Sequence, residues 1–366
     1  MRVLVVNAGS SSLKLRLLDR QDTVLHSADI PAGSDGFDTG RLDAVLQSWQ
    51  EPDVVAHRVV HGGTAFSGAV RIDDAVRREL EDLTDLAPLH QPKSLRALAT
   101  VTERLPDTPA VACFDTGFHT TIPPAAATYP VPKQWRDRYQ IRRYGFHGLS
   151  HAYASRRAAE LLDRPVEGLR LVTCHLGAGA SLTAVVDGRS VDTTMGFTPL
   201  EGIVMATRSG TVDPGLVLWL QEHAQLSPRE VATALVNHSG LTALAGTGDM
   251  RAVEAAARDG DPDAALALDV HTHRLVGGIA AMAAAAGGLD VLVFTGGVGE
   301  NSAAVRRLAA DRLGFLGVGV DRRRNAEVVG DADVTEAGAT VRTLVVAARE
   351  DIQMARETRA LLGVRR

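Results

Sequence analysis

Apolar and polar positions follow the same pattern in two separate stretches of the chain. In the first, an apolar run at 3–6 predicts a buried strand, and alternating leucines at 13–18 predict a second strand that pairs back on it. In the second, an apolar run at 171–174 and a returning strand at 181–186 flank a glycine-rich turn. Two such units, one in each half of the chain, predict a duplicated domain whose two turns face one cleft.

Strands and helices alternate along the rest of the chain, which indicates an α/β protein. Further strands are predicted at 53–56, 110–114, 291–294 and 341–346. Apolar periodicity predicts helices at 73–87, 94–104, 151–162, 214–224, 228–238, 251–258 and 263–287, another from about 303, and a last one that ends near 362. Ser150 is a good N-cap for the helix at 151–162. The proline-rich stretch 122–132 marks the domain boundary, and 193–210 is predicted to be an ordered, partly buried loop.

Three turns have the composition of phosphate-binding loops. The turn at 7–12 contains glycine and serines and precedes Lys14, so its backbone N–H groups and the ammonium can hold a phosphate. An ordinary polar hairpin is the alternative. The turn at 175–180 and the segment 295–302 add glycines that let a ligand approach the backbone. Three such turns in one duplicated chain favour an enzyme that transfers phosphoryl groups from nucleotides.

Charged residues near strand ends suggest ligand contacts, because α/β sheets bind ligands at the carboxyl ends of their strands. Arg58 follows a short strand and precedes a Gly-Gly pair, so it either holds a loop carbonyl or faces an anion. Asp115 follows the strand at 110–114, where it forms an Asx turn, caps a helix or binds a ligand. Glu350 lies where the last strand meets the last helix and is either a first-turn acid or a metal ligand.

Composition narrows the class of protein. A chain of 366 residues predicts two domains, and 45% hydrophobic with 23% charged residues is typical of globular proteins. A net charge of −5 without a basic stripe argues against a nucleic-acid partner. Cys113 and Cys174 lie in apolar runs, which predicts reduced core residues in a cytoplasmic protein. We expect neither a signal peptide nor a membrane partner, since the chain begins directly in a strand and its most apolar helix, at 275–288, is too short to span a bilayer.

Ten segments resemble those of the acetate/propionate kinase family, within the actin-like and sugar-kinase ATPase superfamily. They occur in the family's order over nearly the whole chain: VLVVNAGSSSLKLRL, HRVVHGG, APLHQP, FDTGFH, RRYGFHGLSH, HLGAGASL, TPLEGIVMATRSG, GDMR, FTGGVGENS and ARED. The resemblance implies a two-domain, actin-like (ribonuclease H-like) α/β fold with a duplicated core and an interdomain cleft. It implies an N-terminal domain of residues 1–120 completed by 352–366, a C-terminal nucleotide-binding domain of 121–351, and a homodimer.

The resemblance also implies a reaction: reversible, direct in-line transfer of a phosphoryl group from Mg-ATP to acetate, giving ADP and acetyl phosphate. Asn7 and Glu350 would hold Mg²⁺, or Mn²⁺ in its place. Arg58 would bind the acetate carboxylate, Arg208 the transferring phosphoryl group, and His147 would stabilise the transition state. The substrate methyl group would lie against Val60, Leu89, Phe146 and Pro199. ATP would be held by Ser10, Ser12, Lys14, His175, Leu176, Gly177, Ala178, Gly179, Asp249, Met250, Arg251, Gly297, Val298, Gly299, Glu300 and Asn301.

Asp115 matches the family's catalytic aspartate, yet the chemistry needs no strong base. Acetate is already ionised at pH 7, so the task is to hold two anions and neutralise the charge on the transferring group. We therefore expect Asp115 to orient an arginine or a metal-bound water rather than to accept a proton. Without the family context, Arg208 would be a loop anchor and His147 a hydrogen-bonded turn residue.

Two other functions fit parts of the sequence. A propionate or butyrate kinase would share the motifs and differ in the acyl pocket. A non-catalytic, actin-like nucleotide switch would share the fold, but it would not need both Arg58 and Arg208.

The chain departs from the family at one position of the second glycine-rich turn. The family usually reads His-Leu-Gly-Asn-Gly-Ala-Ser there, whereas this chain has Ala178 in place of the asparagine. An asparagine amide can reach a nucleotide phosphate and an alanine methyl group cannot. We therefore expect an active kinase with weakened nucleotide affinity.

Overall fold

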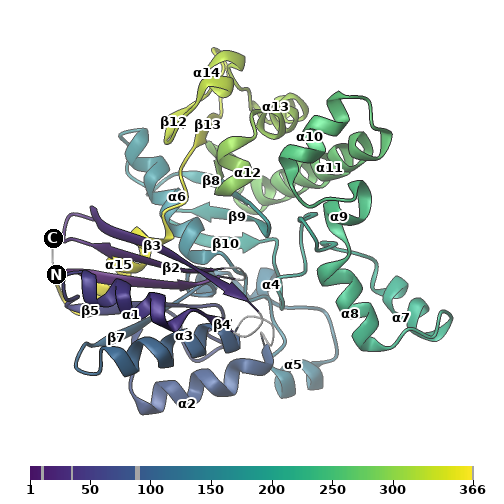
Figure 1. The fold of residues 1–366 in the computed structure, drawn as a ribbon. Helices are drawn as coiled ribbons and strands as arrows, with labels where there is room; N and C mark the ends of the chain where they lie inside the picture. The colour runs from purple at the N-terminus through teal and green to yellow at the C-terminus, as the bar shows by residue number, and fades with distance from the viewer. Residues whose placement is uncertain (10–11, 34–35, 87–90, 365–366) are drawn as a thin grey trace. The chain divides into compact units, whose positions relative to one another are not determined.

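The computed structural model describes residues 1–9, 12–33, 36–86 and 91–364, so Ser10 and Leu89 lie outside the described residues. The chain forms two compact units (Figure 1). The first contains 1–120, 146–153 and 349–366, and the second contains 121–145 and 154–348. The stretches 146–153 and 349–351 thus pack with the first unit, although the predicted domain division assigns them to the second. The predicted division into two domains, 1–120 with 352–366 and 121–351, stays a prediction.

The first unit is built on a sheet that, over the described residues, has the strand order β4-β3-β2-β1-β5-β7-β6. Its strands are β1 (Val3–Ala8), β2 (Ser12–Leu18), β3 (Val24–Gly33), β4 (Gly36–Phe37), β5 (Val54–Val59), β6 (Val70–Arg71) and β7 (Ala110–Phe114). β1 and β2 pair antiparallel from Val3 opposite Leu18 to Ala8 opposite Leu13. The predicted strand–turn–strand unit is therefore confirmed. β5 and β7 run parallel to β1, which brings their carboxyl ends to one edge of the sheet.

The second unit repeats this arrangement in the order β10-β9-β8-β11-β13-β12. Its strands are β8 (Arg170–Leu176), β9 (Ala180–Val186), β10 (Arg189–Thr193), β11 (Val291–Thr295), β12 (Ala332–Asp333) and β13 (Arg342–Val345). Each sheet contains three antiparallel strands in a row, β3-β2-β1 in the first and β10-β9-β8 in the second. Next to them lie two strands parallel to β1 or β8, and an antiparallel strand, β6 or β12, forms the edge. The shared order confirms the predicted duplication.

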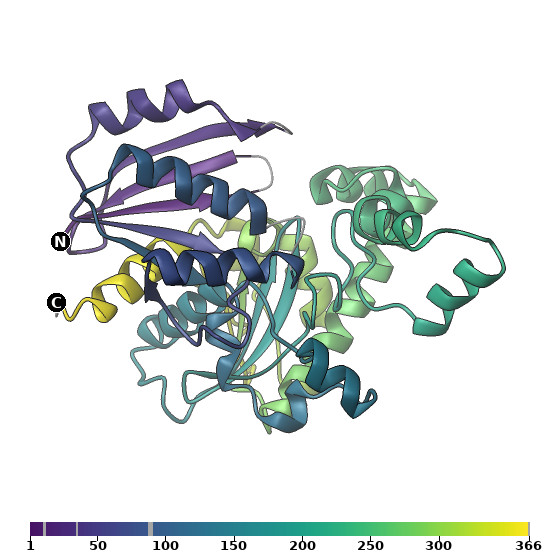
Figure 2. The same cartoon turned by 90° about the horizontal axis from the view of Figure 1, so that it is seen from below.

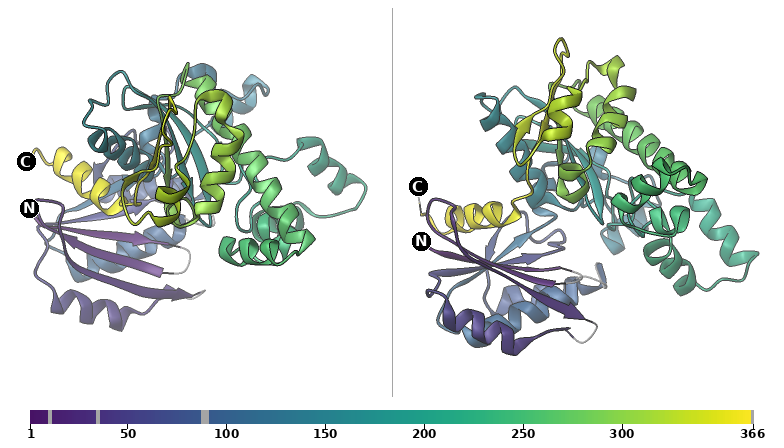
Figure 3. Two further views of the ribbon diagram at one scale, coloured as in Figure 1. Left: turned by 90° about the horizontal axis from the view of Figure 1, so that it is seen from above. Right: turned by 45° about the horizontal axis from the view of Figure 1, so that its top comes forward.

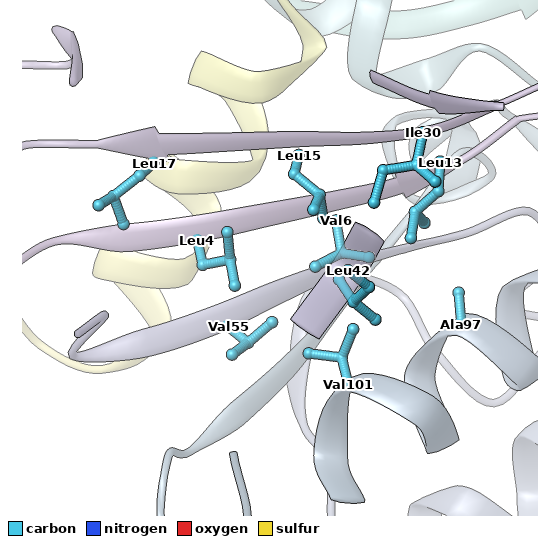
Figure 4. Close-up of a cluster of buried hydrophobic side chains, with 10 residues drawn as sticks. All are labelled: Leu4, Val6, Leu13, Leu15, Leu17, Ile30, Leu42, Val55, Ala97 and Val101. Carbon is cyan, nitrogen blue, oxygen red and sulfur yellow. The ribbon is translucent and has the colours of Figure 1, made fainter. Parts of the chain in front are cut away.

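Alternating side chains give the first sheet two buried faces. One face packs against α1 (Thr39–Ser48) and α3 (Gln91–Arg104), forming the cluster drawn in Figure 4. Its buried members are Leu4, Val6, Leu13, Leu15, Leu17, Ile30, Leu42, Val55, Ala97 and Val101. The other face is covered by α15 (Glu350–Leu361), which Figure 3 shows on the opposite side from α1. Cys113 lies on this face with its thiol near the Met354 carbonyl, and both Cys113 and Cys174 are free and buried, as predicted.

An ion-pair cluster fixes the C-terminal half of α15 to the turn between β2 and β3. Arg356 Nε and Arg359 Nη1 donate to the two oxygens of Asp22 at 2.8 and 2.5 Å. Burial alone would raise the pKa of Asp22, but the two guanidinium groups outweigh it and lower that pKa. The end of α15 therefore lies close to the start of β1 (Figure 2). The helix begins at Glu350, at its opposite end.

Three predicted helix boundaries are wrong for identifiable reasons. α2 (Asp74–Asp82) ends early because its last turn tightens into a 3₁₀ turn at Leu83–Leu86. α3 starts at Gln91, since Pro92 in a first helical turn loses no hydrogen bond. α6 (Gly148–Leu161) starts before Ser150, because the carbonyl of His147 already accepts from the His151 N–H at 2.9 Å. Ser150 is thus inside the helix and is not its N-cap.

The second unit carries most of the remaining helices. They are α4 (Pro124–Ala127), α5 (Lys133–Tyr139), α7 (Pro214–Glu222), α8 (Pro228–Asn237), α9 (Gly240–Ala245), α10 (Met250–Arg258), α11 (Pro262–Ala285), α12 (Gly296–Asn301), α13 (Ala303–Arg312) and α14 (Arg322–Glu327). The predicted glycine turn at 295–302 is therefore mostly the short helix α12. In the described part of the chain, every helix is too short or too polar to cross a membrane.

Candidate active site

Polar side chains from three parallel strands meet at the carboxyl edge of the first sheet. Arg58, near the end of β5, donates from Nε and Nη2 to the two oxygens of Asp115 at 2.9 and 2.5 Å. Its Nη1 donates to Oδ1 of Asn7 at 3.1 Å, and Nδ2 of Asn7 donates to Oε2 of Glu350 at 3.2 Å. The fold thus unites four predicted site residues in one hydrogen-bonded cluster.

The charges of this cluster favour a cation as its ligand. Burial opposes the Arg58 charge, but the Asp115 and Glu350 carboxylates outweigh it and raise the pKa of the guanidinium above its usual range. Arg58 therefore stays charged. Two carboxylates against one guanidinium leave the cluster with a net negative charge. Since a guanidinium has five donors, the bonds to Asp115 and Asn7 leave Arg58 two N–H groups for an anion.

His147 belongs to the same edge of the first unit. The Gly148 N–H donates to the Asp115 carbonyl at 2.7 Å, which places His147 one residue from that contact. A Cβ on Gly148 would collide with this carbonyl, so only glycine permits the approach. His147 has φ of 56°, a left-handed conformation that is uncommon for a side chain of this size. This left-handed residue directly precedes the Gly148–Asp115 contact, and such backbone conformations are often found at functional sites.

The predicted phosphate loop lies next to this cluster. Lys14 is directly opposite Asn7 in the β1–β2 ladder, so the two side chains share one face of the sheet, and Lys14 is exposed. The Gly9 N–H donates to the Ser12 carbonyl at 2.9 Å, which closes the described part of the turn. Ser12 begins β2.

Val60 and Phe146, two predicted pocket residues, are buried in the first unit. Their neighbour His61 packs edge-on against the Phe146 ring, with centroids 5.6 Å apart. Two further residues hold this segment: Gln91 bonds the N–H and carbonyl of His61 at 3.3 Å, and the Thr116 hydroxyl accepts from the Gly62 N–H at 3.0 Å. Our sequence reasoning did not assign roles to Gln91 and Thr116, although both lie within the motifs APLHQP and FDTGFH.

The second unit contains a cavity of about 550 Å³ between its glycine-rich segments. It is lined by the predicted residues Gly177, Ala178, Asp249, Met250, Arg251, Gly297, Val298 and Asn301, together with Gly248, Glu254 and Ser302. Five other predicted nucleotide residues of the second unit lie outside that lining: His175, Leu176, Gly179, Gly299 and Glu300. Leu176 is buried in β8, and the Glu300 carboxylate accepts from the Ala348 N–H at 2.9 Å. These two side chains support the cavity wall rather than face the cavity.

Hydrogen bonds fix the walls of this cavity. The Asp249 carboxylate caps α10 by accepting from the Arg251 N–H at 3.0 Å, and it also pairs with the Arg251 guanidinium. The Asn301 amide donates to the Gly297 carbonyl at 2.8 Å within α12. Arg306, which our sequence reasoning did not consider, is 1% exposed and donates to the Gly299 and Glu300 carbonyls at 2.8 Å. A buried cation thus holds the end of α12 beside the cavity.

Arg208 lies in the loop that follows β10, also in the second unit. Its Nη1 donates to the Pro199 carbonyl at 2.6 Å. Burial lowers the pKa of Arg208 from its usual value. The bond also connects two predicted site residues, because Pro199 is assigned to the methyl pocket. The predicted ordered loop at 193–210 is confirmed as partly buried.

Comparisons with known proteins agree with this architecture. The sequence profile of the acetokinase family matches residues 36–356. An acetate kinase of Microcystis aeruginosa is 43% identical over 98% of each chain. Among solved structures, an acetate kinase of Porphyromonas gingivalis superposes with a TM-score of 0.90 at 34% identity over 99% of each chain. A propionate kinase of Francisella tularensis gives 0.89 at 33% identity over 97% of this chain and 98% of its own. These similarities confirm the predicted two-domain actin-like fold, and the chain therefore belongs to the acetokinase family.

Proposed function

We propose that this protein catalyses the reversible transfer of the γ-phosphoryl group of ATP to acetate, forming ADP and acetyl phosphate. The observation that carries the proposal is the two-pronged Arg58–Asp115 pair beside Asn7 and Glu350. It offers fixed donors for a carboxylate next to oxygens suited to a hard cation. A nucleotide switch without chemistry would have no use for that arrangement.

The residues at this edge fit Mg²⁺, with Mn²⁺ as an alternative. The Asn7 amide and the Glu350 carboxylate supply oxygen donors, which Mg²⁺ prefers, and the net negative charge of the cluster favours a divalent cation. Mg²⁺ is usually bound through one or two protein oxygens plus water and phosphate. When bound, the metal would neutralise charge on the nucleotide phosphates.

In this proposal the first unit holds the acceptor. Arg58 binds the acetate carboxylate through its remaining donors, and Asp115 keeps the guanidinium in one orientation. Val60 and Phe146 enclose the methyl group. His147 donates a hydrogen bond to the phosphoryl oxygens, where charge changes in the transition state. No proton needs to be removed from acetate at neutral pH, so Asp115 acts on Arg58 rather than as a base.

The second unit would hold the donor. The 550 Å³ cavity has room for a nucleotide. Glycines at 177, 248 and 297 allow the nucleotide to approach the protein backbone closely. Lys14 and the serine turn of the first unit would contribute to phosphate binding. Arg208 would stabilise the transferring group, a role in which loss of one donor costs about 10²- to 10³-fold in kcat.

Propionate is the second candidate acceptor, because a propionate kinase of Francisella tularensis shares the fold at 33% identity. Val60 is 7% exposed, which leaves a small apolar surface against which a methyl group can pack. One methylene is worth about 1–3 kcal/mol in such a pocket, so acetate should lead and longer acids should react poorly.

A hydroxamate assay for acyl phosphate tests the proposal directly. Purified protein is given Mg-ATP and each straight-chain carboxylate from C1 to C4, with a metal-free arm and an Mn²⁺ arm. We expect acyl phosphate with acetate, less with propionate, and none without a divalent cation. If a preparation that binds ATP makes no acyl phosphate from any of these acids, the proposed function is wrong.

Two further features of the proposal follow from the family resemblance. We propose a homodimer, which light scattering during size-exclusion chromatography would measure. We also propose a cytoplasmic location, which the two free buried cysteines support, because reduced thiols are usual in that compartment.

A further inference from the structure

Tyr129, in the proline-rich stretch that marks the predicted domain boundary, is built into the loop that carries Arg208. Its hydroxyl donates to Oε2 of Glu201 and accepts from the Phe197 N–H at 3.0 Å. A Cβ on Gly196 would collide with both the Tyr129 hydroxyl and the Glu201 carboxylate. The Tyr129 and Glu201 side chains therefore pack directly against the backbone at position 196, which only glycine allows.

Arg143 holds the same loop from its other side. Its Nη1 donates to three successive carbonyls, those of Thr193, Thr194 and Met195, at 3.0, 3.2 and 3.2 Å. Its Nη2 donates to Oε1 of Glu201 at 2.8 Å, and its guanidinium lies 5.5 Å from the centre of the Tyr129 ring. Glu201 is thus bonded on one oxygen by Arg143 and on the other by Tyr129. Charge-assisted bonds of this kind fix a backbone segment more firmly than neutral bonds do.

The segment held in this way carries the hydrogen-bond acceptor of Arg208. Pro199 lies between Phe197 and Glu201, the two residues that bond to Tyr129, and its carbonyl accepts from Arg208 Nη1 at 2.6 Å. Farther along, the Thr211 N–H donates to the Gly202 carbonyl at 2.8 Å, which closes the loop behind Arg208. A displacement of residues 197–201 would therefore move the Pro199 carbonyl and, with it, the guanidinium.

We propose that Tyr129, acting through Glu201, is a positioning residue for Arg208. The inference rests on the proposed role of Arg208 in phosphoryl transfer. A misplacement of about 1 Å can cost on the order of 10²-fold in rate when a group acts on a transition state. The Tyr129 hydroxyl acts on the loop that carries Arg208 and not on the substrate.

The test compares Tyr129→Phe, Glu201→Gln and Tyr139→Phe with the unchanged protein in the acyl phosphate assay. Tyr139 is the matched control, because it lies on the neighbouring helix α5 and is 52% exposed. Because the Tyr129–Glu201 bond involves a charged partner, we expect Tyr129→Phe to lower kcat roughly five- to twentyfold. Glu201→Gln should lower kcat in the same direction, and Tyr139→Phe should leave it unchanged.

A double-variant cycle separates positioning from general destabilisation. In an Arg208→Ala background, Tyr129→Phe should cause less than a twofold further loss of kcat, because the group that it positions is gone. Melting temperatures are measured alongside. A merely structural role would lower kcat by the same factor in both backgrounds.

Each outcome decides a different point. Normal kcat in both Tyr129→Phe and Glu201→Gln, or equal losses with and without Arg208, would overturn the positioning role. Normal kcat in Arg208→Ala would instead overturn the proposed function of that arginine. If Tyr129→Phe does not fold, Glu201→Gln and its double variant with Arg208→Ala decide the question in the same way.

Discussion

Asp115→Asn tests most directly how the acceptor site works. The substitution keeps the size and planarity of the side chain and removes its charge. Asp115 is 1% exposed and receives two bonds from Arg58, at 2.9 and 2.5 Å. An asparagine retains one carbonyl oxygen, so one of these bonds is lost and an amide N–H group faces a guanidinium N–H group instead.

The expected loss follows from that geometry. A hydrogen bond between charged partners is worth about 1.5–3 kcal/mol, which corresponds to about 10- to 150-fold in kcat/KM if the transition state feels all of it. The backbone bonds of Asp115, to the Val59 carbonyl and from the Gly148 N–H, do not depend on its side chain. We therefore expect the site to stay assembled while Arg58 loses its fixed orientation, with a raised acetate KM and a lowered kcat.

The assay measures kcat and the acetate KM between pH 5.5 and 9, for the unchanged protein and for two variants. Asp290→Asn is the matched control, because Asp290 makes a similar two-pronged pair with Arg170, at 2.9 and 2.7 Å, at the amino ends of β8 and β11. This control should lower the melting temperature and leave kcat near normal. Asp115→Asn should lower kcat/KM at every pH and leave the shape of the pH profile unchanged.

The pH profile also gives the result that would refute this reasoning. If Asp115 accepted a proton, kcat/KM of the unchanged protein would fall on the acid side with the titration of that carboxyl, and the asparagine variant would lack this limb. A change of shape of that kind would make Asp115 a base. Near-normal activity of Asp115→Asn would mean that Arg58 needs no partner to bind acetate.

Three further predictions follow from other parts of the structure. Val60→Ala enlarges the methyl pocket, so the ratio of kcat/KM for propionate to that for acetate should rise by about five- to tenfold; an unchanged ratio would remove Val60 from the pocket. Ala178 lines the 550 Å³ cavity, so Ala178→Asn should lower the ATP KM several-fold and leave the acetate KM unchanged, and no change in either constant would mean that position 178 does not face the phosphates. Buried neutral histidines should make the fold acid-sensitive, because the unfolded chain gains protons below its ordinary histidine pKa near 6.5 that the folded chain excludes. Burial lowers the pKa of His57 to about 3 and that of His61, His119 and His271 to about 4. The free energy of unfolding should therefore be highest above pH 6.5 and fall as the pH drops toward 4. A midpoint of urea unfolding that does not change between pH 7 and pH 5 would contradict this prediction.

The sequence by itself determined the elements and the duplication. Alternation at 13–18 and an apolar run at 3–6 specify paired strands, and their repeat at 171–186 specifies a second copy, because strand pattern is a local property with a period of two residues. Local patterns were less reliable at helix ends. The helix expected from 151 begins at Gly148, because a left-handed His147, held by the contact of its neighbour with Asp115, supplies the first carbonyl.

The tertiary structure decided which of these residues act together. Arg58 was placed near a strand end from sequence, but its bonds to Asn7 and Asp115 span 51 and 57 residues, and the Asn7–Glu350 bond spans 343. Only the parallel order β1-β5-β7, with α15 across the sheet, brings them to one edge. Likewise, nothing in the proline-rich stretch indicates that Tyr129 meets Glu201, 72 residues later. Nor does the local sequence around Arg306 indicate that this residue is buried beside α12. Such contacts depend on strand order and on the charge and space available where the elements meet. The spacing of apolar residues, every 2 residues in a strand or every 3.6 in a helix, carries no information about these properties.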